Sequence, residues 1–470
     1  MDFKALLVNP SFKYIMMSHV IPIGLFNLGK ILKNHGFDIK IIDINAEKQY
    51  GHDFLPDPSS PDEFLKKVKK FDPEVIGFTS YSANYPIAMR MAQMCKTENE
   101  NIKVIFGGIH ATFQATECLT ANPFIDVIVR GEAEHVIAEL ARRLAAEQDL
   151  SGIHNIVFRE NNYIKYSQLN TLPNLSIIPP LDLELIKDKF YPSFLLQVEF
   201  SRGCPFQCAF CCISPFTERN VRYFPAERIV DTLEVYQERF KNFSFSLSDP
   251  TFLLNHKRVK DFLKEAKNRK IELKQWMFET RVDTVNREIL KELKKYDAHT
   301  ISLGIEDIHN SVLQMIGKQQ TFKQIQRAMK IIKEVGLHVE SNFILGLPSQ
   351  TKEQMLDNIE YSKNVDYFGF PCLLPLPGSQ IINHPDKYGI SILSKDWELY
   401  NGREIVTESI SFPYQQQREV QDKAYRFLAQ FQLENDSIFY FERERHKDIL
   451  EIGYHSWQEE WKEKQKSNWN

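Results

Sequence analysis

The sequence predicts an α/β protein with two consecutive strand–helix series and a mostly helical C-terminal region. Short apolar, β-branched runs alternate with amphipathic helical patterns through residues 1–150, and a second such series occupies residues 193–380. A connector at 151–192, interrupted by prolines, separates the two series. Regular alternation of strands and helices is typical of parallel sheets covered by helices. Residues 381–470 are expected to form the helical region.

The first series contains five candidate strands and three helical patterns. The strands are Ala5–Val8, Ile39–Ile44, Val75–Ser80, Val104–Gly108 and Val127–Gly131. The helices are Gly24–His35, Tyr85–Lys96 and Glu132–Glu147. Ligands of open parallel sheets bind beyond the carboxyl ends of the strands. Small residues follow four of these strands, at Asn9–Ser11, Thr79–Ser82, Gly107–His110 and Gly131–Glu132.

The paired glycines Gly107 and Gly108 have two interpretations. Either they let a bulky ligand approach the backbone closely, or they form a tight turn between a strand and a helix. The sequence leaves both open.

The connector is expected to hold a small hairpin around Asn161-Asn162, followed by prolines that break regular structure. Six strand–helix units then follow, which predicts a barrel or partial barrel with its active site at the carboxyl ends of the strands. The strands are Phe194–Phe200, Phe243–Ser248, Gln275–Arg281, Thr300–Glu306, Val339–Leu345 and Tyr367–Leu374. The helices include Ala226–Phe240, Lys257–Arg269, Arg287–Tyr296, Thr321–Val335 and Lys352–Asn364.

Composition limits the possible classes of protein. Hydrophobic residues make up 43% and charged residues 26% of the 470 positions, as in ordinary globular proteins. A net charge of -4 disfavours a general nucleic-acid binder, because such proteins carry a basic excess. The sequence has no uncharged apolar stretch of transmembrane length and no signal-peptide pattern at its start. A cytoplasmic location is therefore expected.

Four of the seven cysteines lie close together, at Cys204, Cys208, Cys211 and Cys212, in the loop after the first strand of the second series. Soft thiolates at such spacing suit an iron–sulfur cluster or zinc. A structural zinc site would need a fourth ligand, and the adjacent Cys212 could not provide it without strain. The pattern therefore favours a cluster with three protein ligands. The other cysteines, Cys95, Cys118 and Cys372, are expected to be packed thiols.

The motif Cys204-x3-Cys208-x-Phe210-Cys211 resembles that of the radical S-adenosylmethionine (SAM) superfamily. Further segments are spaced as in that family: Arg281-Val-Asp283, Leu303-Gly-Ile-Glu306, Ile316-Gly-Lys318, Phe343–Pro348 and Pro375–Ser379. The resemblance implies that the three cysteines hold a [4Fe–4S] cluster whose open iron binds SAM. Reduction would then cleave SAM to methionine and a 5′-deoxyadenosyl radical.

The resemblance also implies SAM contacts. Phe210 is expected near the adenine, Glu306 on the ribose and Lys318 on the carboxylate. Many members bind the amino group with a Gly-Gly-Glu-like motif, where this chain has Ser248–Phe252, so Asp249 is the candidate. Two further residues, Glu279 and Arg281, are expected to face the same cavity.

The first series resembles the cobalamin-binding domain of the B12-binding radical SAM class in Pro22–Leu25, Gly107–Thr112 and Val129–Glu134. The two resemblances together imply a Rossmann-like cobalamin domain, a partial (β/α)6 barrel of TIM type and a C-terminal region that shapes the substrate pocket. The expected cobalamin contacts are Ser11, Gly24, Ser80, Tyr81, Gly107, Gly108, His110, Gly131 and Glu132. The N-terminal series has no Asp-x-His-x-x-Gly motif, so His110 is expected to shape its loop rather than bind cobalt.

These features predict a cobalamin-dependent radical SAM enzyme that abstracts hydrogen from an unactivated carbon and transfers a methyl group from methylcobalamin. Ring closure, ring contraction or carbon–carbon coupling, with or without cobalamin, is the alternative. An iron–sulfur or corrinoid carrier without catalysis is disfavoured, because it would not need Glu306 and Lys318. The expected substrate is a small molecule, a lipid or a peptide, and the expected reductant is a flavodoxin or ferredoxin. No side chain is assigned a catalytic role.

Overall fold

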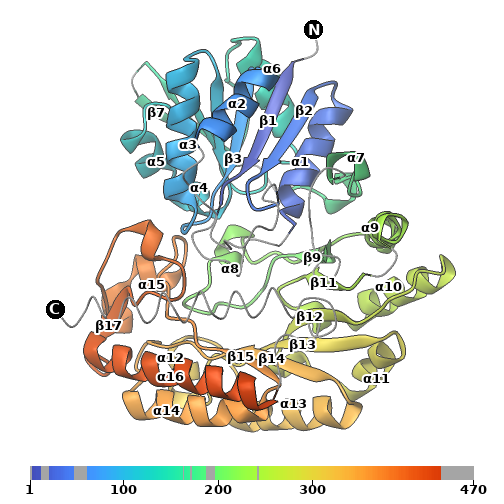
Figure 1. The fold of residues 1–470 in the computed structure, drawn as a ribbon, viewed down its shortest axis with the longest axis vertical. Coiled ribbons are helices and arrows are strands. Elements are labelled where there is room, and N and C mark those ends of the chain that lie inside the picture. The colour runs from blue at the N-terminus through green and yellow to red at the C-terminus, as the bar shows by residue number, and fades with distance from the viewer. Residues whose placement is uncertain are drawn as a thin grey trace.

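The structure is a computed structural model that describes residues 3–11, 21–46, 61–161, 163–169, 172–186, 196–240 and 243–435. Two sheet-containing domains lie one above the other, and the C-terminal segment packs beside the second (Figure 1). Residues 436–470, with part of the expected C-terminal region, lie outside the described residues.

The N-terminal domain is built on a seven-stranded sheet in the order β2-β1-β3-β4-β5-β6-β7. Strands β1 to β5 pair in parallel, as predicted, and β6 and β7 form an antiparallel hairpin. This hairpin was expected in the connector, but it extends the edge of the sheet. The strands are β1 Lys4–Asn9, β2 Asp38–Asp43, β3 Val75–Thr79, β4 Lys103–Gly107, β5 Val127–Val129, β6 Ile156–Glu160 and β7 Tyr163–Tyr166.

Helices cover both faces of this sheet. Alternate residues of β1 accordingly enter two separate hydrophobic cores. Ala5 and Leu7 face one core, and Leu6 and Val8 face the other. The helices are α1 Ile23–Asn34, α2 Pro61–Phe71, α3 Tyr85–Glu98, α4 Ile109–Phe113, α5 Ala115–Ala121 and α6 Ile137–Ala145. The strand order reverses between β1 and β3, which makes the loops after these two strands the expected ligand site.

The second domain is a six-stranded parallel sheet in the order β8-β11-β12-β13-β14-β15, which confirms the expected partial barrel. The strands are β8 Leu196–Glu199, β11 Phe245–Ser248, β12 Trp276–Arg281, β13 Ala298–Gly304, β14 His338–Asn342 and β15 Tyr367–Gly369. The main helices are α9 Ala226–Arg239, α10 His256–Asn268, α11 Arg287–Lys295, α13 Phe322–Val335 and α14 Lys352–Tyr361. Between β8 and α9 lie the short strands β9 Ser201–Arg202 and β10 Arg222–Tyr223 and the helix α8 Ile213–Phe216.

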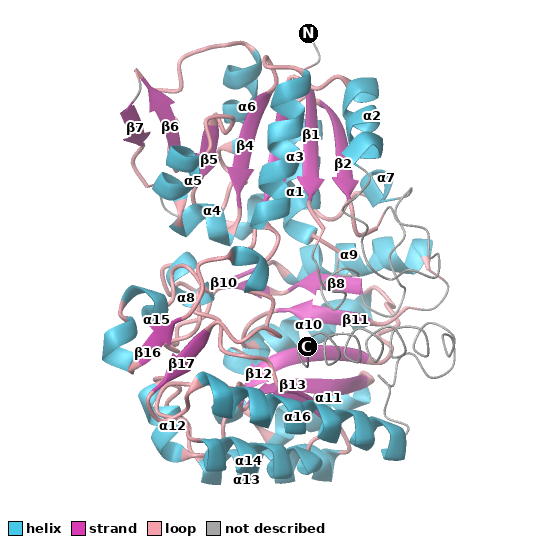
Figure 2. Ribbon diagram, turned by 60° about the vertical axis from the view of Figure 1, so that its left-hand side comes forward, coloured by secondary structure: helices cyan, strands magenta, loops and turns pink. Residues whose placement is uncertain are grey.

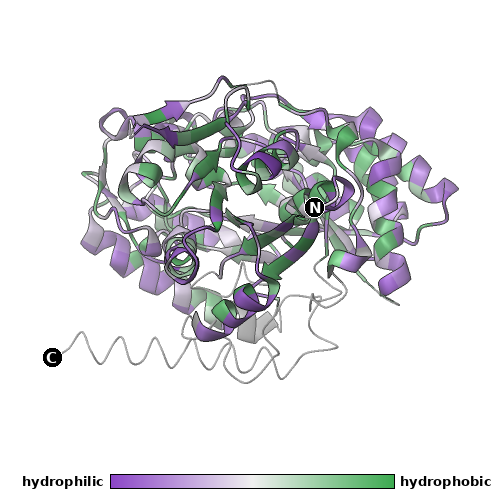
Figure 3. Ribbon diagram, turned by 90° about the horizontal axis from the view of Figure 1, so that it is seen from above, coloured by the Kyte–Doolittle hydropathy of each residue, from purple (hydrophilic) through white to green (hydrophobic). Residues whose placement is uncertain are grey.

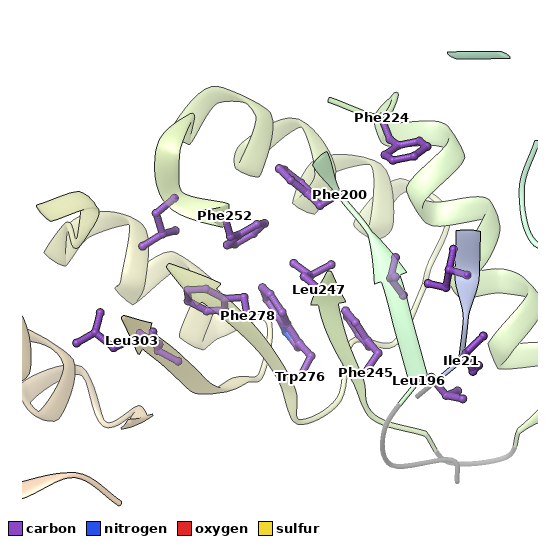
Figure 4. Packing of buried hydrophobic residues seen from close by; sticks show 14 of the residues in the cluster. Ile21, Leu196, Phe200, Phe224, Phe245, Leu247, Phe252, Trp276, Phe278 and Leu303 are labelled. Atoms are coloured by element: carbon purple, nitrogen blue, oxygen red, sulfur yellow. The ribbon is translucent and has the colours of Figure 1, made fainter. Parts of the chain in front are cut away.

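Aromatic packing stabilises the helix-covered face of this second sheet (Figure 4). Trp276 stacks on Phe245 with ring centroids 5.6 Å apart, and Phe252 and Phe278 pack against its other sides. All four rings are almost completely buried. Each such ring removes about 150 Å² or more of surface from water, so this layer supplies much of the stabilisation of the domain. Seen from above, apolar strands lie inside helices whose outward turns are hydrophilic (Figure 3).

The C-terminal segment closes the molecule on one side. A two-stranded sheet, β16 Ile390–Ile392 and β17 Thr407–Ser409, precedes α16 Tyr414–Asn435, which lies beside α14. A 3-10 turn between the two strands reaches the N-terminal domain, where Glu398 accepts a hydrogen bond from Arg90 at 2.7 Å. None of the described helices has the length and apolar character needed to span a membrane.

The arrowheads of β1, β2 and β4 point toward the second domain (Figure 2). The carboxyl ends of the N-terminal sheet therefore face the region where α8 and the cysteine loop lie. The expected ligand loops of one domain are thus opposed to the expected cluster loop of the other.

Candidate active site

The cluster loop, residues 203–212, follows β9 directly, and close packing fixes its backbone at the first residue. Gly203 has a φ of +98°, and a Cβ at this position would lie 1.9 Å from the carbonyl oxygen of Asn220. Only glycine fits such a close approach. Further along the loop, the N–H of Ala209 donates to the carbonyl oxygen of Ile316 at 2.8 Å. The loop is thus held by segments that are distant in the sequence.

Cys204, Cys208 and Cys211 are partly accessible, whereas Cys212 is buried. Within the described residues, no three His, Cys, Asp or Glu side chains converge as they would around one metal ion. In a four-iron cluster each thiolate binds a different iron, so the ligands need not meet at a point. Three accessible thiols, with Cys212 buried away from them, provide the ligands that a four-iron cluster needs, whereas a structural zinc site would need a fourth. Burial raises the pKa of the Cys211 thiol to about 12, and metal binding would be needed to form its thiolate.

A buried arginine lies beside the cluster loop. Arg281 places Nη1 3.8 Å from the sulfur of Cys208, and its guanidinium lies 3.7 Å from the ring centroid of Phe206. Asp283 and the carbonyl oxygen of Lys318 accept hydrogen bonds from the same guanidinium. A fixed positive charge next to a sulfur ligand favours the more reduced, more negative state of a cluster.

The structure brings Glu306 and Lys318 together, with Oε1 and Nζ 2.6 Å apart. Glu306 has a φ of +63°, and it bridges β13 and β14 by accepting from Ile344 and donating to Asn342 through its backbone. Gly304 leaves room for the pair, because a Cβ there would lie 2.8 Å from the Lys318 Nζ. Both expected SAM contacts thus lie at one point beyond β13, and Lys318 Nζ is also 5.9 Å from the ring centroid of Phe210.

Asp249 is buried and committed to internal hydrogen bonds. Its Oδ2 accepts from Ser201 at 2.5 Å, and its Oδ1 accepts from the N–H of Thr251 at 2.7 Å. Burial raises the pKa of Asp249 to about 6, although these two hydrogen bonds lower it. Thr251 also lies 3.8 Å from the sulfur of Cys204, so Asp249 supports the turn that contacts the cluster loop.

Glu279 is the accessible carboxylate of this region. Burial raises its pKa to about 7, and the neighbouring Glu306 and Glu340 raise it further. The side chain remains in contact with solvent, although other carboxylates and Lys318 lie near it. The strand register places Glu279 opposite Ser302 and Ser302 opposite Glu340, on one face of three neighbouring strands.

In the loops predicted to bind cobalamin, the surroundings of each glycine show whether the turn itself requires a residue without a side chain. A Cβ on Gly108 would lie 2.6 Å from the carbonyl oxygen of Ser80, so this glycine is required by the turn. A Cβ on Gly107, Gly24 or Gly131 would meet nothing within 4 Å. Of the two interpretations of Gly107-Gly108, the tight turn therefore applies to Gly108, and Gly107 leaves open space. Ser11 and Ser80 are buried.

His110 and Tyr81 of these loops have different neighbours. His110 is buried, stacks on Tyr85 and meets the edge of Trp397, and burial lowers its pKa to about 3. It is therefore neutral at physiological pH. The surrounding protein raises the pKa of the Tyr81 phenol by desolvation, and Cys212 of the cluster loop raises it further.

Glu132 does not reach into open space. Its two carboxylate oxygens accept hydrogen bonds from Arg202 and Arg222 of the second domain. The segment Gly131–Val136 consequently runs as a loop, and α6 begins at Ile137 instead of Glu132. These arginines, and Glu134, were not found from the sequence. The only signals were the position of Arg202 directly before Gly203-Cys204 and the charge repeat in Arg130-Gly-Glu-Ala-Glu134.

Comparisons with known proteins agree with this architecture. The Radical SAM superfamily matches residues 198–361, and the B12 binding domain matches residues 17–141. The chain is 30% identical over 432 residues to an uncharacterised methyltransferase of Pyrococcus horikoshii, which covers 90% of this chain and 91% of that protein. The chain belongs to the B12-binding class of the radical SAM superfamily. A [4Fe–4S] cluster, SAM and cobalamin are the cofactors implied by these two domains.

Other relatives differ in the reaction that they are named for. An anaerobic magnesium-protoporphyrin IX monomethyl ester cyclase of Rubrivivax gelatinosus is 27% identical over 363 residues, which cover 74% of this chain and 64% of that protein. Among solved structures, the methyltransferase TsrM from Kitasatospora setae matches with a TM-score of 0.72 and 16% identity, over 92% of this chain and 89% of that one. At such identity the likeness confirms the fold only.

Proposed function

We propose that the chain is a cobalamin-dependent radical SAM methyltransferase that methylates an unactivated carbon of its substrate. The observation that carries the proposal is the opposition of the cluster loop to the ligand loops of the B12 domain. Phe113 of α4, which follows Gly107-Gly108, packs against Phe216 of α8, which follows the cluster loop, with ring centroids 6.4 Å apart. This arrangement supports a site between the domains in which bound SAM and a bound corrin would face each other.

The bound cofactors would supply the radical and methyl-transfer chemistry, since a reduced [4Fe–4S] cluster cleaves SAM and methylcobalamin carries a transferable methyl group. The protein holds the cluster through Cys204, Cys208 and Cys211. Arg281 holds a positive charge 3.8 Å from Cys208 and fixes the backbone carbonyl of Lys318. These contacts would hold the cluster loop and the Lys318 segment in a fixed position relative to each other.

Glu306 and Lys318 would bind SAM by exchanging part of their ion pair for bonds to the ligand. Lys318 is 4% exposed, so its ammonium is directed to this point with little freedom. A carboxylate ligand would pair with Nζ and leave Glu306 to accept from ribose hydroxyls. Glu279, whose pKa is raised to about 7, would lie next to this pair.

The substrate class proposed here is a small molecule, a lipid or a peptide, with a flavodoxin or ferredoxin as reductant. The second candidate function is ring closure by the same radical chemistry. It is favoured by the cyclase of Rubrivivax gelatinosus, which is 27% identical to this chain. The two functions share the SAM cleavage step and differ in whether a methyl group leaves the corrin.

The test is to purify the protein without oxygen from cobalamin-supplied cells and to incubate it with a reductant and S-(trideuteromethyl)-SAM. We expect about four irons and close to one cobalt per chain, 5′-deoxyadenosine formation, and trideuteromethyl label in the extracted corrin. A Cys208→Ala variant, which removes one cluster ligand, should form no 5′-deoxyadenosine. Iron and 5′-deoxyadenosine without cobalt or label would refute methyl transfer and favour the cyclase reaction.

A further inference from the structure

An ion cluster formed by both domains surrounds Arg202. Its guanidinium donates to Glu134 at 2.6 Å, to Glu132 at 3.0 Å and to Glu199 at 2.8 Å. The Arg202 side chain is 15% exposed, and the side chains of Glu132 and Glu134 are each 5% exposed. Two of these carboxylates come from the B12 domain and one from β8. The ion cluster therefore joins the two domains at a point that is largely shielded from water.

Two more arginines balance the negative charge of the ion cluster. Arg222 pairs with Glu132, and Arg228 lies 3.7 Å from Glu199. Three carboxylates thus meet three guanidinium groups. A buried ion pair adds little net stability, because desolvation of the charges offsets their attraction. Such an arrangement is better suited to fix the relative position of the parts that carry it.

On the barrel side, the ion cluster is connected rigidly to the iron ligands. Arg202 is followed directly by Gly203 and Cys204, and the backbone at Gly203 runs so close to Asn220 that a Cβ would lie 1.9 Å from the Asn220 carbonyl oxygen. Arg202 is also paired with Arg222 in the β9–β10 sheet, so that both arginines hold Glu132 from adjacent strands. A movement of Glu132 would therefore be passed to Cys204.

On the side of the B12 domain, the ion cluster is connected to the glycine loop, residues 107–113 at the end of β4. Glu132 follows Gly131, whose N–H donates to Thr112 Oγ1 at 2.9 Å. The same hydroxyl donates to the carbonyl oxygen of Gly108 at 2.8 Å. One chain of contacts thus runs from the loop after β4 to the first cluster cysteine.

We propose that Glu132 and Arg202 are positioning residues that set the distance and orientation of the cluster loop relative to the corrin-binding loops. The inference rests on the proposed function and deepens it, because methyl transfer and hydrogen abstraction at one substrate carbon require the two cofactors in a fixed relation. A misplacement of about 1 Å costs on the order of a hundredfold in rate. Glu132 then acts through Arg202 and does not contact the corrin.

The test uses Glu132→Gln and Arg202→Lys, with Glu398→Gln as the matched control. Glu398 also forms an ion pair across the two domains, with Arg90 of α3, and both residues lie outside the Arg202 ion cluster and outside the segments whose exchange is measured. The first readout is hydrogen exchange of cofactor-free protein. We expect about tenfold faster exchange in residues 203–212 for Glu132→Gln and in 107–113 for Arg202→Lys, from the loss of a charge-assisted hydrogen bond.

Residues 289–293 of α11 should exchange at the wild-type rate in both variants, because a general loss of stability would accelerate them too. The second readout is the distance distribution between cob(II)alamin and the reduced cluster, from pulsed electron paramagnetic resonance of the loaded protein. We expect it to broaden in both variants and to stay unchanged in Glu398→Gln. Because Glu132→Gln keeps a hydrogen-bonding amide, it tests the proposal even where Arg202→Lys does not fold.

Three results would overturn the inference. If both variants exchange at the wild-type rate in residues 203–212 and 107–113, the ion cluster does not connect the two loops. Loss of cobalt from Glu132→Gln with iron retained assigns Glu132 to the corrin itself. An unchanged distance distribution in the loaded variants excludes a positioning role. Absence of cobalt from the wild-type protein would instead refute the proposed function, while the exchange data would still decide whether the loops are coupled.

Discussion

Replacing Glu279 by glutamine should stabilise the cofactor-free protein at alkaline pH and leave it unchanged at acidic pH. The folded pKa of Glu279 is about 7, against an ordinary value of 4.5, because burial and the neighbouring Glu306 and Glu340 penalise its charge while Lys318 relieves part of the penalty. The raised pKa means that protonation accompanies folding. The carboxylate therefore costs nothing below pH 4.5, and its cost grows until the pH exceeds 7.

The magnitude follows from the size of the shift. A rise from 4.5 to about 7, at about 1.4 kcal/mol per pH unit, sets an upper limit of about 3.5 kcal/mol. Glu279 is accessible to solvent, and water screens such a charge, so we reduce the expected effect to about 1 kcal/mol. Glutamine has the same shape without the charge and should recover this amount at pH 8.

The assay is urea unfolding of wild-type protein and Glu279→Gln at pH 4.5 and pH 8. Glu238→Gln, an exposed position on α9, is the control for removing one negative charge. We expect the unfolding free energies of the two proteins to coincide at pH 4.5 and to differ by about 1 kcal/mol at pH 8. An equal difference at both pH values, or a less stable variant at pH 8, would refute the reasoning.

Three further predictions concern the cluster loop and the SAM site. Cys204→Ser should lower iron from about four per chain to below one, whereas Cys212→Ser should keep it; equal iron loss in both would contradict the ligand assignment. Gly203→Ala should cost about 3 kcal/mol in urea unfolding, because its Cβ would overlap the Asn220 carbonyl; a wild-type midpoint would contradict this. Lys318→Met should weaken SAM binding by roughly thirtyfold or more in calorimetry, and unaltered affinity would remove Lys318 from the site.

The strands were predictable because each is a short apolar run bounded by turn residues. β12 was expected at Gln275–Arg281 and lies at Trp276–Arg281. β15 is shorter than expected, with three residues, because Pro371 follows it and the chain beyond pairs only through an isolated bridge at Cys372. Proline removes a ladder donor, so the run of apolar residues overstated the strand.

The site was predictable where its residues are close together in the sequence. The three cysteines lie within one loop, and their chemistry does not depend on the rest of the fold. The ion cluster was not predictable in this way, since Glu132 lies 70 residues before Arg202 and 90 before Arg222. A local reading assigns Glu132 to a helix start, where an acidic residue is favourable. The arginines of the second domain hold it in a loop instead.

The strands of the barrel alternate between apolar and polar residues. Strands buried on both faces read as continuous apolar runs, and the interior of an ordinary closed barrel is filled by branched aliphatic side chains. In β12 the outward Phe278 is buried, whereas the inward Glu279 is accessible and continues through Ser302 to Glu340 on the neighbouring strands. The outer face carries the buried aromatic layer, whereas the inner face of these strands carries polar side chains. Alternation within a parallel strand is therefore itself a sequence signal of a barrel that encloses a site.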